Sequence, residues 1–146
     1  MSRLIYLDNA ATTKTAPEVV DAMIPYFTEH YGNPSSVYSF ASGNKEVVSR
    51  QREIIAQALG AQANEIYFTA GGSESDNWAL KATAEAYEKK GKHIITTKIE
   101  HHAILHTCEY LEKQRGFEIT YLDVDENGVV KLDELKKAIR PDTILI

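Results

Sequence analysis

The sequence has little of three features that would mark a particular class of protein. It holds one cysteine, Cys108, in 146 residues, which excludes an internal disulfide framework and a zinc site built from several cysteines. No apolar run approaches the ~20 residues of a transmembrane helix, and residues 1–8 (MSRLIYLD) lack the long apolar core of a signal peptide. The net charge of -5 and the scattered lysines leave no broad basic surface. We therefore expect a cytoplasmic protein that binds neither nucleic acid nor membrane.

What the sequence does contain, from residue 65 onward, is an alternation of strand-like and helical segments. Helical periods occur at 75–90, 103–115 and 132–139. Short β-branched or aromatic runs alternate with them at 65–69, 93–97, 118–123 and 142–146. Gly60, Gly91 and Gly116 each follow a helical stretch, as helix-ending glycines do. The alternation predicts the α/β class: a mainly parallel sheet in a three-layer arrangement with helices.

The segment before residue 60 follows a different pattern. Its expected elements are a strand at 4–7, a polar stretch to residue 15, and helices at 17–30 and 45–59. Thr15 and Glu18 are spaced as a capping box around Pro17, and Pro25 is expected to bend or restart the first helix. We divide the chain into an N-terminal arm (1–15), a helical segment (16–60) and the start of an α/β domain (61–146).

Residues 142–146 begin one more β-like run with no turn or polar tail after it. A domain rarely ends on half of a buried strand, so we expect this chain to be a truncated fragment of a longer protein. Uncovered apolar sheet edges would then favour self-association.

A junction at 68–77 (FTAGGSESDN) is the strongest local indication of a site. A strand is expected to run through Gly71 and Gly72 into a helix, and if the junction is only a tight turn, Ser73 is expected to cap that helix. Such a junction presents unpaired N–H groups and the positive end of a helix dipole, and glycines let a phosphate approach the main chain. The spacing is that of neither a P-loop nor a Gly-x-Gly-x-x-Gly turn. It predicts either an anion site or a plain strand-to-helix turn.

Histidines follow the next expected strand. Residues 100–106 (EHHAILH) place His101 and His102 at the carboxyl end of that strand, where ligands gather in open α/β sheets. An imidazole there could stack on a flat heterocycle or move a proton near neutral pH. His102 and His106, four residues apart, could instead bind a metal, but no third ligand is in sight, so the sequence favours no metal site. Solvated or capping histidines are the plainer alternative.

A second metal hypothesis comes from 123–134 (DVDENGVVKLDE), which has the spacing of a calcium-binding loop. Two features count against calcium: a β-rich segment precedes the loop where a helix is required, and Lys131 occupies a ligand position. The sequence favours a strand, a turn at Asn127 and Gly128, and a new helix.

Cys108 is a candidate nucleophile only at first sight. It shares a helical face with Ile104, Leu105 and Leu111, and the pattern provides no dedicated base beside it. We predict a buried core thiol.

Four motifs occur in a fixed order along the chain: 6–13 (YLDNAATT), 32–36 (GNPSS), 68–77 (FTAGGSESDN) and 97–103 (TKIEHHA). Together they resemble the cysteine desulfurases of the NifS/IscS type, which belong to the class V aminotransferases. The resemblance extends to 125–128 and 140–146, so it covers essentially the whole chain. It implies the large domain of a fold-type-I enzyme that uses pyridoxal 5'-phosphate (PLP), with the calcium-like loop as a family turn.

The implied activity is removal of sulfur from L-cysteine, leaving alanine and an enzyme persulfide for iron–sulfur cluster or thio-cofactor synthesis. By this resemblance Gly72 and Ser73 would hold the cofactor phosphate, and His101 would stack on the pyridine ring and serve as a catalytic proton carrier. The implied partners are L-cysteine, a sulfur-acceptor or scaffold protein, and a second subunit of a homodimer. A selenocysteine lyase or another class V relative is an alternative within the same fold.

Three parts of the family's machinery have no counterpart in these 146 residues. They are the Schiff-base lysine, the aspartate paired with the pyridine nitrogen, and the cysteine that accepts sulfur. We therefore expect the whole protein to be an enzyme and this chain alone to be inactive, binding phosphate or PLP weakly at most. A noncatalytic phosphate-binding or partner-docking domain is the alternative from another class.

Overall fold

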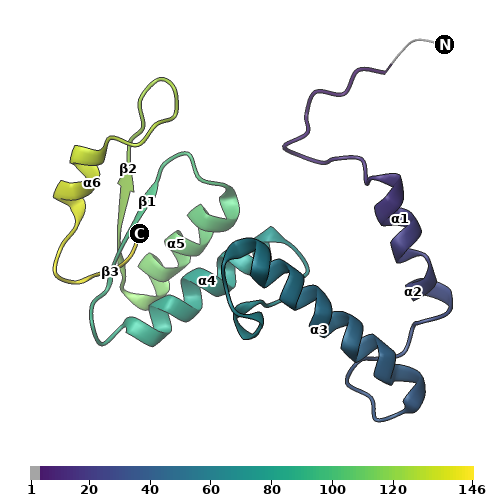
Figure 1. The fold of residues 1–146 in the computed structure, drawn as a ribbon. Coiled ribbons are helices and arrows are strands. Elements are labelled where there is room, and N and C mark those ends of the chain that lie inside the picture. Colours follow the sequence, from purple (N-terminus) through teal and green to yellow (C-terminus); the bar gives the residue numbers. More distant parts are fainter. Residues whose placement is uncertain (1–3) are drawn as a thin grey trace. The chain divides into compact units, whose positions relative to one another are not determined.

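The computed structural model describes residues 4–146, and the chain separates into two compact units (Figure 1). We call Met1–Tyr67 the N-terminal unit and Phe68–Ile146 the C-terminal unit. Within the described residues, no helix combines the length and the apolar character needed to cross a membrane. The three-part division at residues 15 and 60 stays a prediction.

The N-terminal unit is helical. Its elements are α1 (Pro17–Met23), α2 (Pro25–Thr28), α3 (Ser39–Leu59) and the 3-10 turn η1 (Ala63–Glu65). Pro25 restarts the first helix, as predicted, because a proline removes a backbone donor. The long helix begins at Ser39 and not at residue 45, because the serines and Gly43 at its start are weak helix formers that hide the periodicity.

Two predictions for this unit are wrong. The cap of α1 is Ala16, which makes no side-chain bond, so Thr15 and Glu18 form no capping box. The reason is positional: with Pro17 as the first helical residue, Glu18 stands one place too early to reach back to the cap. Residues 4–7 form no strand, and Leu4 is 88% exposed. Strand-forming side chains do not make a strand without a hydrogen-bonded neighbour.

The C-terminal unit holds a parallel sheet. Strands β1 (His93–Thr97), β2 (Glu118–Leu122) and β3 (Thr143–Leu145) lie in the order β2-β1-β3, and both pairs are parallel. Helices α4 (Gly72–Tyr87) and α5 (His102–Arg115) lie on one side of the sheet and α6 (Leu132–Ala138) on the other (Figure 1). The predicted α/β class with a parallel sheet is confirmed.

The strand expected at 65–69 is absent. Residues 63–65 form η1, and 66–69 have no strand structure, although Ile66 is extended. The aromatic and β-branched side chains favour an extended backbone, but a strand also needs a partner for its N–H and C=O groups.

The core of the C-terminal unit fills the space between the sheet and its two long helices. It is a cluster of buried side chains: Leu80, Ala84, Ile94, Cys108, Leu111 and Phe117. Cys108 is fully buried, as predicted, and burial together with the Glu100 and Glu112 carboxylates raises the pKa of its thiol to about 11. A thiol in that state is a packing group and a poor nucleophile.

Two glycines of the C-terminal unit have different roles. Gly116 ends α5 with a left-handed φ of 68°, as the sequence predicts. Gly91 follows the last turn after α4, where a Cβ atom would lie 2.1 Å from the carbonyl oxygen of Asp142. Gly91 is therefore required by the close approach of the Asp142 backbone, which immediately precedes β3.

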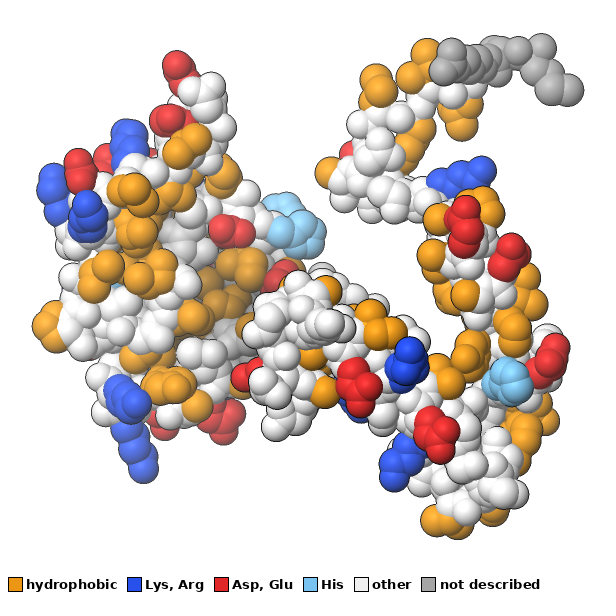
Figure 2. Space-filling model, in the orientation of Figure 1, with side chains coloured by type: hydrophobic (Ala, Val, Ile, Leu, Met, Phe, Trp, Pro, Cys, Tyr) orange, Lys and Arg blue, Asp and Glu red, His pale blue; other side chains and the backbone are white. Residues whose placement is uncertain are grey.

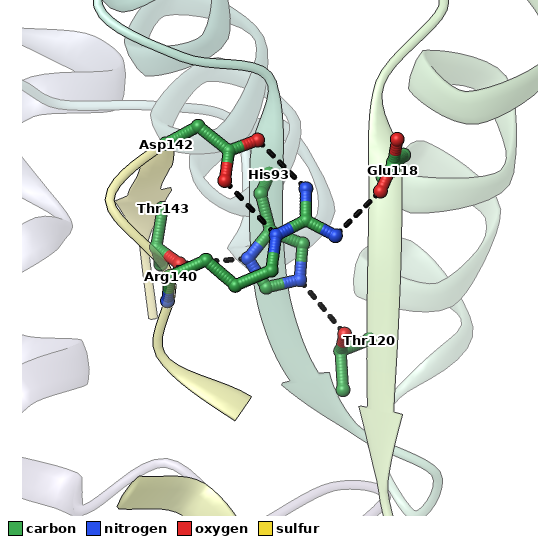
Figure 3. Close-up of polar contacts among 6 residues, drawn as sticks. All are labelled: His93, Glu118, Thr120, Arg140, Asp142 and Thr143. Atoms are coloured by element: carbon green, nitrogen blue, oxygen red, sulfur yellow. Dashed lines mark hydrogen bonds and ion pairs between the residues drawn. The ribbon is translucent and has the colours of Figure 1, made fainter. Parts of the chain in front are cut away.

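At the amino-terminal ends of the strands, a buried histidine links all three (Figure 3). His93 of β1 bonds through Nδ1 to the Thr143 hydroxyl of β3 and through Nε2 to the Thr120 hydroxyl of β2, each at 2.7 Å. Burial, with the nearby Arg140 guanidinium, lowers the pKa of His93. The neutral ring thus belongs to the folded structure.

Arg140 ties the same ends together from the outside (Figure 3). Its guanidinium donates to Glu118 at 2.5 Å and, through Nε and Nη2, to both carboxylate oxygens of Asp142 at 2.9 and 2.7 Å. The bidentate bond lowers the pKa of the Asp142 carboxyl. This end of the sheet is occupied by structural contacts, which leaves the carboxyl ends of the strands for a site.

Candidate functional site

The first candidate element is the start of α4. Gly71 is the cap, with extended backbone at φ 166°, and the helix begins at Gly72. Ser73 is the second helical residue and not the cap, so that prediction is wrong; the flexible glycine pair lets the helix begin two residues earlier. The N–H groups of Gly72 and Ser73 have no acceptor within the helix because they belong to its first turn.

Side chains hold this junction in place. The Glu74 carboxylate accepts the Ala70 N–H at 2.5 Å, and the Thr69 and Ser75 hydroxyls are 2.7 Å apart. Glu74 is thereby directed toward the backbone that precedes the helix. These two bonds connect the loop to the first turn of α4, and the acidic side chain is bound to the loop.

Open space surrounds the glycines. A Cβ atom built on Gly71 or Gly72 would meet nothing within 4 Å. Glycine is therefore not required there by packing, and a ligand could reach the backbone amides. Free N–H groups, a helix dipole and open space fit a phosphate.

His101 is the cap of α5. Its backbone is extended, and its Nδ1 accepts the Ala103 N–H at 3.1 Å. The capping alternative raised from the sequence is therefore realised. Because Nδ1 accepts, the neutral ring carries its proton on Nε2, and the cap fixes the orientation of the imidazole.

One pocket joins the two junctions. Its volume is about 390 Å³, and it includes Ser73 from the start of α4 and His101 from the start of α5. The remaining lining side chains come from the same two helices: Asn77, Lys81, His102, Ala103, His106, Thr107 and Tyr110. Gly72 is not among the lining residues. Figure 2 shows histidine side chains gathered on the surface of the C-terminal unit.

The sequence did not single out three side chains of this pocket. Asn77 and Lys81 continue the helical face of Ser73, and Tyr110 continues that of His102 and His106. The Lys81 ammonium lies 5.0 Å from the centroid of the Tyr110 ring. The spacing of four residues was visible in both helices, but only the packing of α4 against α5 brings the two faces together.

His102 and His106 lie side by side on α5. Their ring centroids are 5.3 Å apart and the rings are nearly parallel, at 15°. His106 Nδ1 is 3.5 Å from the Glu109 carboxylate. The α-helix thus presents two exposed imidazoles on one wall of the pocket.

The calcium-like segment is a turn. Strand β2, and not a helix, enters it, and Asp123 pairs with Lys98 at 2.7 Å. The Asp125 carboxylate accepts the N–H groups of Asn127 at 2.9 Å and Val129 at 2.8 Å. The predicted strand, turn and helix are confirmed.

Known proteins are similar to this chain over nearly its whole length. The chain is 58% identical over all of its residues to a protein of Clostridium botulinum (strain Kyoto / Type A2) named cysteine desulfurase IscS, and it spans 36% of that protein. A solved NifS-like protein matches 95% of this chain and 38% of its own, at 44% identity and a TM-score of 0.90. A structure described as SspA in complex with cysteine matches 94% of this chain and 40% of its own, at 40% identity and a TM-score of 0.87.

These similarities extend through both units. The chain thus has the α/β fold of NifS-like proteins, in which it corresponds to rather more than a third of the polypeptide. The sequence pattern of the aminotransferase class-V family matches residues 5–146, so the chain belongs to that family.

Proposed function

We propose that this chain is the N-terminal part of a PLP-dependent cysteine desulfurase. The complete protein would convert L-cysteine to L-alanine and an enzyme persulfide that supplies sulfur for iron–sulfur cluster or thio-cofactor synthesis. The observation that carries the proposal is the pocket shared by Ser73 and His101. The likeness to proteins named cysteine desulfurase supports it.

The proposed phosphate site is the first turn of α4. The N–H groups of Gly72 and Ser73 and the Ser73 hydroxyl would donate to the phosphate oxygens, and the helix dipole adds a favourable field. The bond between Glu74 and Ala70 keeps the acidic side chain engaged with the loop, which limits its repulsion of the anion.

His101 is the proposed cofactor-stacking and catalytic residue. Its Nδ1 is held by the Ala103 N–H, so the ring is oriented before any ligand arrives. The Nε2–H remains available to donate a hydrogen bond. When bound, PLP would act as an electron sink for the electron pair left at the substrate's Cα.

The proposal also includes the domain organisation, the location and the partners of the protein. Residues 61–146 would be the start of the PLP-binding domain, preceded by the arm (1–15) and the helical segment (16–60). We further propose a cytoplasmic homodimer that passes sulfur to an acceptor or scaffold protein. Because the chain spans 36% of its desulfurase relative, turnover is assigned to the complete protein, and this chain alone is expected to be inactive.

The phosphate site can be tested with Gly72→Ala. The new methyl group enters open space and a helix, so the fold should persist, but it occupies the position proposed for the phosphate. We expect binding of inorganic phosphate and of PLP, followed by calorimetry and by PLP absorbance, to weaken roughly tenfold, or ~1.4 kcal/mol.

Gly43→Ala is the matched control, because it also places a methyl group in open space within a helix, far along the sequence in α3. Equal phosphate affinity in the two variants would refute the phosphate site. Assays of cysteine and selenocysteine turnover by the complete protein separate the desulfurase from a selenocysteine lyase.

A further inference from the structure

We propose that His102 and His106 form a chelating site for one divalent transition-metal ion of the borderline class, such as Zn²⁺ or Ni²⁺. The proposal is independent of the desulfurase assignment. It concerns His102 and His106 on the α5 wall of the pocket, whereas the proposed cofactor contacts are Gly72, Ser73 and His101.

The helix places both imidazoles side by side, and the stacked rings would turn about their side-chain torsions so that one nitrogen of each faces the same ion. Residues four apart lie on one face of an α-helix, one turn from each other. The two rings are nearly parallel, with centroids 5.3 Å apart, and both side chains are exposed and line the same pocket. Once one imidazole binds the ion, the second binds intramolecularly, at a high effective concentration.

A carboxylate stands behind one of the ligands. Glu109 lies 3.5 Å from His106 Nδ1, and Lys113 bonds to the same carboxylate. An Nδ1–H donated to a carboxylate leaves Nε2 as the metal-binding atom, which is the usual outer-shell arrangement of a metal-binding histidine.

His101 is excluded as a third ligand. Its Nδ1 lone pair accepts the Ala103 N–H, and the neutral ring then carries a proton on Nε2. The three neighbouring histidines thus differ: His101 can only donate a hydrogen bond through Nε2, whereas His102 and His106 can act as ligands.

The ion would keep water in its other coordination positions. Among residues 4–146, no group of three or more His, Cys, Asp or Glu side chains is placed to hold a metal. Two imidazoles favour ions that bind nitrogen ligands well, and the expected order of affinity is Ni²⁺ < Cu²⁺ > Zn²⁺. Ca²⁺ and Mg²⁺ prefer oxygen ligands and should bind more weakly. The sequence favoured no metal site because it could not show that the rings of His102 and His106 lie side by side. It also could not show that the Glu109 carboxylate lies next to His106.

The test is calorimetric titration of the chain with Zn²⁺ alone, together with Ni²⁺-induced broadening of the histidine proton signals. We expect one ion per chain, with broadening greatest at His102 and His106. His102→Ala and His106→Ala should each weaken binding about a hundredfold. Glu109→Gln should weaken it about tenfold, since it removes the carboxylate behind His106.

Two histidine variants are the controls. His101→Ser keeps a capping oxygen at the start of α5, and His30→Ala changes a histidine of the N-terminal unit. Both should bind Zn²⁺ like the unchanged chain. Absence of saturable binding up to about 1 mM Zn²⁺, or equal weakening by His101→Ser, would overturn the proposal.

Discussion

The two units differ in how they bury apolar side chains. Among residues 4–67 of the N-terminal unit, the buried residues are two alanines and one amide, Ala41, Ala56 and Asn44. The C-terminal unit buries larger groups on both sides of a sheet, among them Ile94, Ile95, Leu111 and Phe117. Large side chains of the N-terminal unit, such as Phe27 at 71% and Leu59 at 72%, are exposed instead.

This difference in burial predicts that the two units differ in their free energy of unfolding. Free energy of unfolding comes mainly from apolar area removed from water, so the C-terminal unit should resist unfolding and the N-terminal unit should open readily. Local polar bonds partly compensate: the Asn44 amide donates to the carbonyl oxygens of His30 and Gly32, at 2.6 and 2.5 Å, and holds the loop before α3.

Truncating matched leucines gives the largest expected contrast. Leu111 is 2% exposed in the core of the C-terminal unit, so Leu111→Ala should lower the free energy of unfolding by ~2–5 kcal/mol. Leu59→Ala, at an exposed position of α3, should change it by no more than ~0.5 kcal/mol. Urea unfolding followed by circular dichroism and by Trp78 fluorescence measures both. A loss above ~2 kcal/mol for Leu59→Ala would break the comparison.

Two glycine-to-alanine substitutions should change the stability of the two units in opposite directions. Gly91→Ala places a Cβ 2.1 Å from the Asp142 carbonyl and should destabilise the C-terminal unit by ~1–3 kcal/mol, because β3 must move. Gly43→Ala meets nothing within 4 Å in α3 and should stabilise that helix by ~0.5–1 kcal/mol. Thermal unfolding of both variants checks the signs; a neutral Gly91→Ala would show that β3 does not approach this turn.

The smallest effect is a dependence on pH that belongs to the C-terminal unit. The pKa of His93 is lowered from its ordinary 6.5, so the unfolded chain binds a proton more readily than the folded one. Stability is therefore complete above about pH 6.5 and falls as the pH decreases. The charged groups facing the ring are Arg140, Asp142 and Glu118, and the lowered pKa of Asp142 acts in the same direction at lower pH.

Urea unfolding at about pH 7.5 and about pH 5.5 measures this dependence. His93→Gln, which has no group that titrates in that range, should have the flatter profile of the two. A stability that rises toward pH 5.5 in the unchanged chain would contradict the neutral state of the buried ring.

The sequence predicted well where local signals agreed with one another. Strand β1 begins and ends where its β-branched run does, and Gly116 ends α5 as a helix-ending glycine should. The fully buried thiol of Cys108 followed from its helical face. The prediction of a strand at 65–69 is wrong. Its side chains favour an extended backbone, but a strand also needs a hydrogen-bonded neighbour, which local sequence does not determine.

By itself, the sequence determined the α/β class, the order of the elements from α4 onward, and the two junctions that carry Ser73 and His101. Only the tertiary structure decided that these junctions open into one pocket, with Lys81 and Tyr110 beside them. It also decided which nitrogen of His101 is occupied and that His102 and His106 lie ring to ring. The physical reason is that spacing along the chain fixes which face of a helix a residue occupies, whereas the packing of α4 against α5 determines what that face meets.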